Sequence, residues 1–167
     1  MDYIGWLKNK DLEYKDGILH FANLNMIDVA EKYGTPIYVI NEEMIRKRYR
    51  KLKEKLDSVY SKNGIYFAVK SNSNLSVLKI LNSEGACFDC TSTGEIYECF
   101  KVGIPPEKII FTGNMFTNED FKFAVENKVH VNLDSISQLR RLNKIFEYLG
   151  IEKQTISFRI NPEFGAG

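Results

Sequence analysis

"GIYFAVKSNSNLSVLKILNSEGACFDC", residues 64–90, contains one complete unit of secondary structure. Its first run, 64–69, is apolar and typical of a β-strand, and an apolar segment with helical character follows it. Gly85 then marks the end of that helix, and a second β-prone run begins at Ala86. Strand, helix and strand in this order predict a parallel βαβ unit.

The same unit recurs along the chain. Five β-prone runs begin near Gly64, Ala86, Lys108, Val129 and Thr155, at steps of 22, 22, 21 and 26 residues. No G-x-G-x-x-G dinucleotide fingerprint follows any of these runs, so the even spacing favours a (βα)8 TIM-type barrel over an open doubly wound sheet. We therefore expect an α/β fold with about five of the eight units of a barrel, in a chain that looks cut short.

Signals for helix ends lie between the predicted strands. Ser92 to Glu95, Thr117 to Asp120 and Ser135 to Gln138 fit or approximate capping boxes, and each directly follows a strand. Glycines at 103 and 150, like Gly85, lie where the helices should end. These signals support serial βα architecture.

A different pattern precedes the repeat. Residues 34–40 predict a strand that is entered through a proline, and a helix should follow from Asn41. The basic run in that helix could contact nucleic acid, but a stripe of apolar residues favours a solvated amphipathic helix: Ile45, Tyr49, Leu52 and Leu56. We expect an N-terminal segment, 1–33, and the N-terminal part of a barrel, 34–167.

Composition limits the classes of partner. Lys and Arg number 23 and Asp and Glu 22, so no broad field of one sign predicts binding to nucleic acid or to an anionic membrane. No apolar stretch approaches the about 18 residues of a membrane span, and residues 1–10 lack the order of a signal peptide. With three cysteines, the chain suits a reducing compartment. We expect a cytoplasmic protein that acts on a small molecule or contacts another protein.

Lys70 ends the first apolar run. Strand alternation places Tyr66, Ala68 and Lys70 on one face, which would point into the barrel at the carboxyl ends of the strands, where barrel enzymes perform catalysis. An amine held there, away from water, would become a nucleophile able to form Schiff bases. The alternative is a lysine that leaves the strand for solvent.

The stretch "YFAVKSNSNLSVLKILNSEG" resembles the cofactor-attachment motif of the fold type III pyridoxal-phosphate decarboxylases. The resemblance continues, in the family's order, through "CFDCTSTGEIYECFKVGIPPEKIIFTGN", "VNLDSISQL" and "FRINP", and it spans about residues 27 to 165. Within the family the chain is most similar to the diaminopimelate decarboxylases, although "FDCTS" is also similar to the ornithine decarboxylases. The "SNSN" after the lysine differs from the motif of the alanine racemases.

The resemblance implies a site. Lys70 would hold pyridoxal 5'-phosphate through a Schiff base, and Asp89 and Arg159 match residues that border the same pocket. From the residues alone, Asp89 and Arg159 could equally be ion-pair partners at the barrel mouth. Ser92 and Glu95 could form an acid–base pair, but helix capping explains them without chemistry.

Other reactive side chains are weaker candidates. Cys87 and Cys90 form a C-x-x-C, but in a strand they point to opposite faces, and no second half completes a metal site. We therefore expect no metal. His20 and His130 are isolated along the chain, and Asn114 ends a strand where it could border the pocket.

The resemblance also implies an activity. A carboxy-lyase of this family removes carbon dioxide from an amino acid, here most simply meso-diaminopimelate, to give L-lysine in lysine biosynthesis. Ornithine, arginine or lysine as substrate, or a non-catalytic fragment or regulatory homologue, are the alternatives. The family forms homodimers and carries further cofactor-binding residues downstream, so we expect this chain alone to be inactive. The terminal "FGAG", 164–167, should begin a loop.

Overall fold

The structure is a computed structural model that describes residues 11–160. The expectation for 164–167 lies outside these residues. The chain divides into two compact units, Met1–Glu43 and Met44–Gly167. The boundary expected between residues 33 and 34 stays a prediction.

The first unit contains a small antiparallel sheet in the order β1-β2-β3, with one helix after it. Its elements are β1 (Leu12–Lys15), β2 (Ile18–Phe21), β3 (Leu24–Asn25) and α1 (Met26–Tyr33). β1 and β2 form a hairpin whose two-residue loop, Asp16 and Gly17, has positive φ at both positions. Such loops match the twist of paired strands.

Residues 34–40 were expected to form a strand, and this prediction is wrong. The segment has no regular secondary structure, and Tyr38 in it is fully exposed. Its β-prone side chains have no neighbouring strand in the described sheets, whose strands are β1 to β3 and β4 to β8. A strand is stable only when its backbone groups are paired. Helix α2 (Glu42–Val59) follows, with Tyr49 of its apolar stripe buried and Leu52 exposed.

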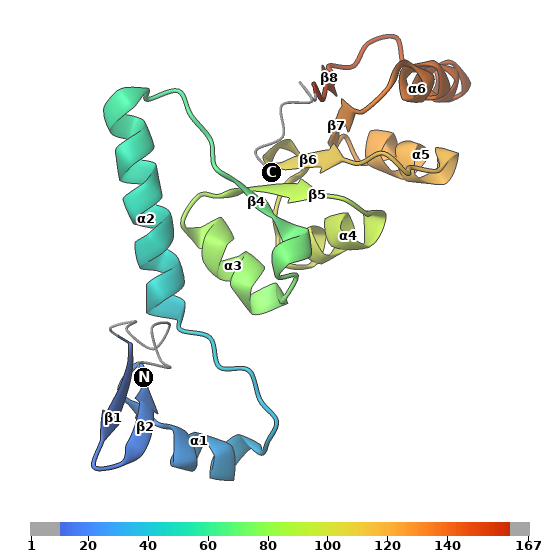
Figure 1. Cartoon of the computed structure of the whole chain (residues 1–167). Helices are drawn as coiled ribbons and strands as arrows, with labels where there is room; N and C mark the ends of the chain where they lie inside the picture. Colours follow the sequence, from blue (N-terminus) through green and yellow to red (C-terminus); the bar gives the residue numbers. More distant parts are fainter. Residues whose placement is uncertain (1–10, 161–167) are drawn as a thin grey trace. The chain divides into compact units, whose positions relative to one another are not determined.

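The second unit contains a five-stranded parallel sheet in the order β4-β5-β6-β7-β8 (Figure 1). The strands are β4 (Tyr66–Ala68), β5 (Cys87–Cys90), β6 (Ile109–Thr112), β7 (His130–Leu133) and β8 (Ser157–Phe158). The helices that connect them are α3 (Leu75–Ser83), α4 (Thr93–Lys101), α5 (Asn118–Glu126) and α6 (Ile136–Leu149). A doubly wound sheet reverses its strand order at a switch point, but this order never reverses. The fold is therefore a partial TIM barrel, as the repeat predicts.

The two faces of the sheet differ in polarity. On one face, side chains of β5, β6 and β7 are buried in a core shared with the helices: Phe88, Cys90, Ile109, Phe111, Val131 and Leu133. The alternate residues are only partly buried and form the face that lines the interior of a barrel, which we call the lumen face: Cys87, Asp89, Ile110, Thr112, His130 and Asn132. The predicted alternation is thus confirmed, with Cys87 and Cys90 on opposite faces.

Hydroxyl side chains begin three helices of this unit. Thr117 and Asp120 form a full capping box at α5. At α4, the Ser92 hydroxyl accepts from the Glu95 N–H, but the Glu95 carboxylate accepts from the N–H of Thr91, one residue earlier than a capping box requires. The same offset occurs at α6, where Gln138 Oε1 accepts from the N–H of Asp134. In each of the three helices the hydroxyl satisfies one free N–H of the first turn.

An ion cluster joins α2 to the end of α3. Arg46 and Arg50 both donate to the carboxylate of Glu84, at 2.7 Å and 2.6 Å. These hydrogen bonds, first from Arg50 and then from Arg46, lower the pKa of Glu84 to about 2. Glu84 therefore stays ionised at all but strongly acidic pH.

Candidate cofactor site

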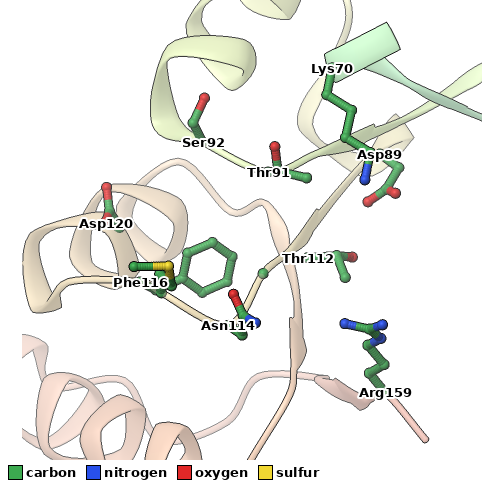
Figure 2. A pocket seen from close by; sticks show the side chains of 11 residues that line it. Lys70, Asp89, Thr91, Ser92, Thr112, Asn114, Phe116, Asp120 and Arg159 are labelled. Atoms are coloured by element: carbon green, nitrogen blue, oxygen red, sulfur yellow. The ribbon is translucent and has the colours of Figure 1, made fainter. Parts of the chain in front are cut away.

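A cavity of about 720 Å³ opens at the carboxyl ends of the parallel strands. The three site residues expected from the sequence, Lys70, Asp89 and Arg159, all line it. They come from the ends of β4, β5 and β8, so only the folded sheet brings them together (Figure 2). An amine, a carboxylate and a guanidinium thus share one cavity at the edge where barrel enzymes carry their chemistry.

Lys70 lies in a different element from the one expected. β4 ends at Ala68, and Lys70 belongs to a 3₁₀ turn, η2 (Val69–Ser71). The polar residues after it end the strand, because the Ser71 hydroxyl donates to the Ala68 carbonyl at 2.7 Å and Asn72 Oδ1 accepts from the Asn74 N–H at 3.1 Å.

The amine of Lys70 was also expected to be shielded from water, and this is wrong for the described chain. The Lys70 side chain is exposed, because five strands form an open sheet whose lumen face solvent can reach. The side chain nevertheless extends from its turn toward the end of β5 (Figure 2). A primary amine is therefore presented to the cavity.

Asp89 carries an unsatisfied oxygen. Its Oδ1 is buried and has no hydrogen-bond partner within residues 11–160. Desolvating a carboxylate oxygen without a partner is costly, and a ligand or ion in the cavity is one kind of partner that would offset this cost. Asp89 sits on β5 beside Ala68 of β4, two residues before Lys70. This places the unsatisfied oxygen close to the base of the turn that carries the amine.

Arg159 is held by its backbone just past β8. Its N–H donates to the Leu133 carbonyl at 2.7 Å, which continues the β7–β8 ladder. The guanidinium is half-exposed and lies 3.4 Å from the Asp134 carboxylate. An exposed pair at that separation is weak, so the guanidinium remains available to a second anion.

Other residues complete the cavity. Asn114, which from the sequence could border the pocket or act only as a loop amide, lines the cavity, and Ser92 lines it as well as capping α4. Thr112 and Phe116 were not anticipated. Thr112 could have been found from strand alternation, since it lies on the lumen face of β6, but a threonine in a strand carries no distinctive signal. Phe116 lies in a loop whose course the sequence did not predict.

The remaining reactive residues lie elsewhere. Cys90 and Cys99 are both buried, with their sulfurs 3.7 Å apart, and the neighbouring thiol and burial raise the pKa of Cys90. Glu95 accepts from the backbone N–H and the hydroxyl of Thr91, next to the Ser92 cap of α4, so its carboxylate is already bound. Within residues 11–160, no three His, Cys, Asp or Glu side chains lie close enough together to hold a metal ion.

The residues of the cavity fit pyridoxal phosphate. The cofactor needs a primary amine for its aldehyde, and Lys70 supplies one. It also carries anionic oxygens that a guanidinium can bind, and Arg159 supplies that group. The unsatisfied Asp89 oxygen is placed to accept a hydrogen bond from a protonated group of the ligand.

Comparison with known proteins supports this fit. The sequence profile of the family "Pyridoxal-dependent decarboxylase, pyridoxal binding domain" matches residues 42–167. The chain belongs to this family. Its resemblance to fold type III decarboxylases is therefore confirmed, and the cofactor named by the family is pyridoxal.

Among individual family members, the chain is similar to diaminopimelate decarboxylases. It is 41% identical to that of Methanothermobacter thermautotrophicus, over 94% of this chain and 36% of the relative. It is 35% identical to that of Methanocaldococcus jannaschii, over 95% and 37%. The chain thus spans little more than a third of the length of these relatives.

Solved structures agree with the sequence comparison. The crystal structure of the M. jannaschii diaminopimelate decarboxylase with L-lysine matches with a TM-score of 0.84 and 36% identity, over 93% of this chain and 37% of that one. A lysine/ornithine decarboxylase from Vibrio vulnificus matches at 24% identity and a TM-score of 0.69, over 84% and 37%, which shows a shared fold alone.

Proposed function

We propose that this chain is the cofactor-binding part of a decarboxylase that converts meso-diaminopimelate to L-lysine, as in lysine biosynthesis. The observation that supports it best is the cavity that gathers Lys70, Asp89 and Arg159. The names of the relatives at 35% and 41% identity, and the L-lysine bound by one of them, support this substrate over ornithine or arginine. The proposal includes a homodimeric, cytoplasmic whole protein.

Each site residue has a role in this proposal. Lys70 would hold the cofactor by its aldehyde and, once the amine of the substrate has displaced it, its Nζ would carry a proton to the α-carbon of the product. When bound, pyridoxal phosphate supplies a ring that accepts the electrons of the bond to the departing carboxylate. Arg159 binds an anionic group of the ligand, and Asp89 accepts a hydrogen bond through its buried oxygen.

Covalent trapping tests the role of Lys70. The chain is incubated with pyridoxal phosphate, reduced with borohydride and digested, and the modified peptide is identified by mass spectrometry. We expect modification at Lys70 and a visible absorbance band that Lys70→Ala abolishes. Lys79→Ala, which removes an exposed lysine of α3, serves as the matched control and should leave the band unchanged. Equal labelling of many lysines would contradict a specific site.

A chimera tests the reaction. Residues 1–167 replace the corresponding part of the M. thermautotrophicus relative, and carbon dioxide release is measured with meso-diaminopimelate, ornithine, lysine and arginine. We expect release from meso-diaminopimelate, its loss in the Lys70→Ala chimera, and none from the 167-residue chain alone. A folded chimera that is inactive on all four substrates would favour a non-catalytic role, and preference for another substrate would correct the substrate assignment.

A further inference from the structure

A row of hydrogen-bonded polar side chains crosses the lumen face of three neighbouring strands. His130 Nε2 lies 2.9 Å from Ser157 Oγ, and Ser157 Oγ donates to Asn132 Oδ1 at 2.9 Å. Asn132 Nδ2 in turn donates to Thr112 Oγ1 at 3.4 Å. We call these four residues the lumen row. None of them was assigned a role from the sequence or in the proposed reaction.

The lumen row has a direction. Ser157 has a single hydroxyl proton, which it donates to Asn132, so His130 Nε2 must be the donor in its contact with Ser157. The same bond fixes the amide of Asn132, whose Nδ2 then faces Thr112. Thr112 Oγ1 accepts this bond, so the row does not use the Thr112 proton. Within residues 11–160 the Thr112 hydroxyl has no acceptor, so the row ends in a hydroxyl that can donate to a ligand.

The free end of the row lies in the cofactor site. Thr112 lines the same cavity as Lys70, Asp89 and Arg159. It pairs with Asn132, which pairs with Ser157, two residues before Arg159 on the same strand face. Figure 2 shows Thr112 between Asp89 and Arg159. A hydroxyl donor and a guanidinium thus face one region of the cavity.

We propose that Thr112 donates a hydrogen bond to an anionic oxygen of the bound ligand, and that His130, Asn132 and Ser157 are positioning residues that hold it in the donating orientation. The proposal rests on the proposed function, because that function supplies the ligand. A hydroxyl donor beside a guanidinium is suited to an anionic oxygen, since hydrogen bonds to charged acceptors are the stronger kind. The oxygen belongs either to the cofactor or to the carboxylate of the amino acid.

Affinity measurements on the 167-residue chain test this role. Pyridoxal phosphate is titrated into wild type, Thr112→Val and Thr112→Ser, with the visible band as the readout. If the oxygen belongs to the cofactor, we expect Thr112→Val to weaken binding roughly tenfold, which corresponds to about 1.4 kcal/mol, and Thr112→Ser to restore it. Thr155→Val, at an exposed threonine that lies before β8 and outside the cavity, is the matched control and should bind as wild type does.

A second arm identifies the oxygen. The chain is first reduced with borohydride so that the cofactor is fixed, and L-lysine and meso-diaminopimelate are then titrated by calorimetry. A Thr112→Val effect on cofactor affinity assigns the bond to the cofactor, and an effect confined to the amino acids assigns it to their carboxylate. Either result supports the proposal.

The positioning role has its own readout. Ser157→Ala removes the bond that orients Asn132, so the side-chain amide resonances of Asn132 should shift in the ligand-free chain and ligand affinity should fall severalfold. Circular dichroism melts show whether each variant is folded. If Thr112→Val does not fold, the ligand affinity of Ser157→Ala tests the proposal instead. If the folded variants bind every ligand as wild type does, the lumen row has no such role and the proposed function survives. If wild type itself binds no pyridoxal phosphate, the proposed function fails and the inference fails with it.

Discussion

At the scale of single residues, Gly113 shows how tightly the loop after β6 is packed. A Cβ added there would lie 2.7 Å from the ring of Phe116, and that ring stacks on Phe111 with centroids 3.9 Å apart. We expect Gly113→Ala to displace the ring and lower the free energy of unfolding by about 1–3 kcal/mol. Urea denaturation followed by circular dichroism measures the change.

Gly94 provides the matched control. A Cβ there would meet only Ser92 Oγ, at an ordinary 3.7 Å, and Gly94 lies in α4, where alanine is preferred by up to about 1 kcal/mol. Gly94→Ala should therefore be neutral or stabilising. If Gly113→Ala behaves in the same way, the Phe116 ring is not held as tightly as its stacking indicates.

Residues that carry distinctive chemistry could be predicted, whereas those that act by position could not. The sequence brought out Lys70, Asp89 and Arg159 through a resemblance, and the fold brings all three to one cavity. It did not anticipate that Lys70 would sit in a 3₁₀ turn, because the local hydrogen bonds of Ser71 and its neighbours end the strand early. The functional roles of Lys70, Asp89 and Arg159 stay predictions.

At the scale of elements, α5 depends on its capping box. The Thr117 hydroxyl accepts from the Asp120 N–H at 3.1 Å, and the Asp120 carboxylate accepts from the Thr117 N–H at 2.8 Å. We expect Thr117→Ala to destabilise the chain by about 0.5–2 kcal/mol, with Thr117→Ser close to wild type because it keeps the hydroxyl. Thermal melts compare the two, and equal losses in both would mean that the methyl group matters more than the cap.

The attachment of α2 to α3 should depend on pH. Arg46 and Arg50 lower the pKa of Glu84 from 4.5 to about 2, so the folded state binds its proton less readily than the unfolded state does. The ionised group therefore stabilises the fold above about pH 4.5, and this contribution is lost as the pH falls toward 2. Urea unfolding across this range should show a smaller loss of stability for Glu84→Gln than for wild type.

The control for the loss of one negative charge is a carboxylate that does not contact Arg46 or Arg50. Glu107 is exposed in the short helix η3 (Pro106–Lys108), and the stability of Glu107→Gln is measured in the same way. If Glu84→Gln keeps the full acid sensitivity, other carboxylates govern it.

Elements were predictable where the pattern repeats and not where it is local. The βα units followed from a period of 21–26 residues, and their helix starts followed from hydroxyl caps. The N-terminal hairpin was missed although Asp16 and Gly17 are a strong turn signal, because its strands are only four residues long. Residues 34–40 were assigned wrongly from composition, since strand propensity alone does not supply a pairing partner.

At the scale of the whole molecule, the described sheet has two outer strands, β4 and β8. Within residues 11–160 the outer edges of these two strands have no partner strand, and these edges, together with Phe158 exposed on β8, favour pairing with another copy. We expect the average mass in analytical ultracentrifugation to rise with protein concentration, and Phe158→Lys to reduce that rise by placing a charge on the edge.

Tyr148→Lys is the control for this association. Tyr148 is more exposed than Phe158, at 78% against 44%, but lies on α6 and not on a strand. Tyr148→Lys should leave the rise of average mass with protein concentration unchanged. Equal effects of the two substitutions would point to general apolar association.

The described helices include none long and apolar enough to cross a membrane.

The unreversed strand order has a consequence for how the chain is made. Each strand of the sheet pairs with the one before it, as Phe67 does with Phe88 and Phe111 with Val131, so every addition closes a loop of similar length. Each strand from β5 to β8 therefore has a partner strand that precedes it in the sequence. The sheet can therefore form progressively during synthesis on the ribosome, because each βα unit that emerges can pair with the strand before it.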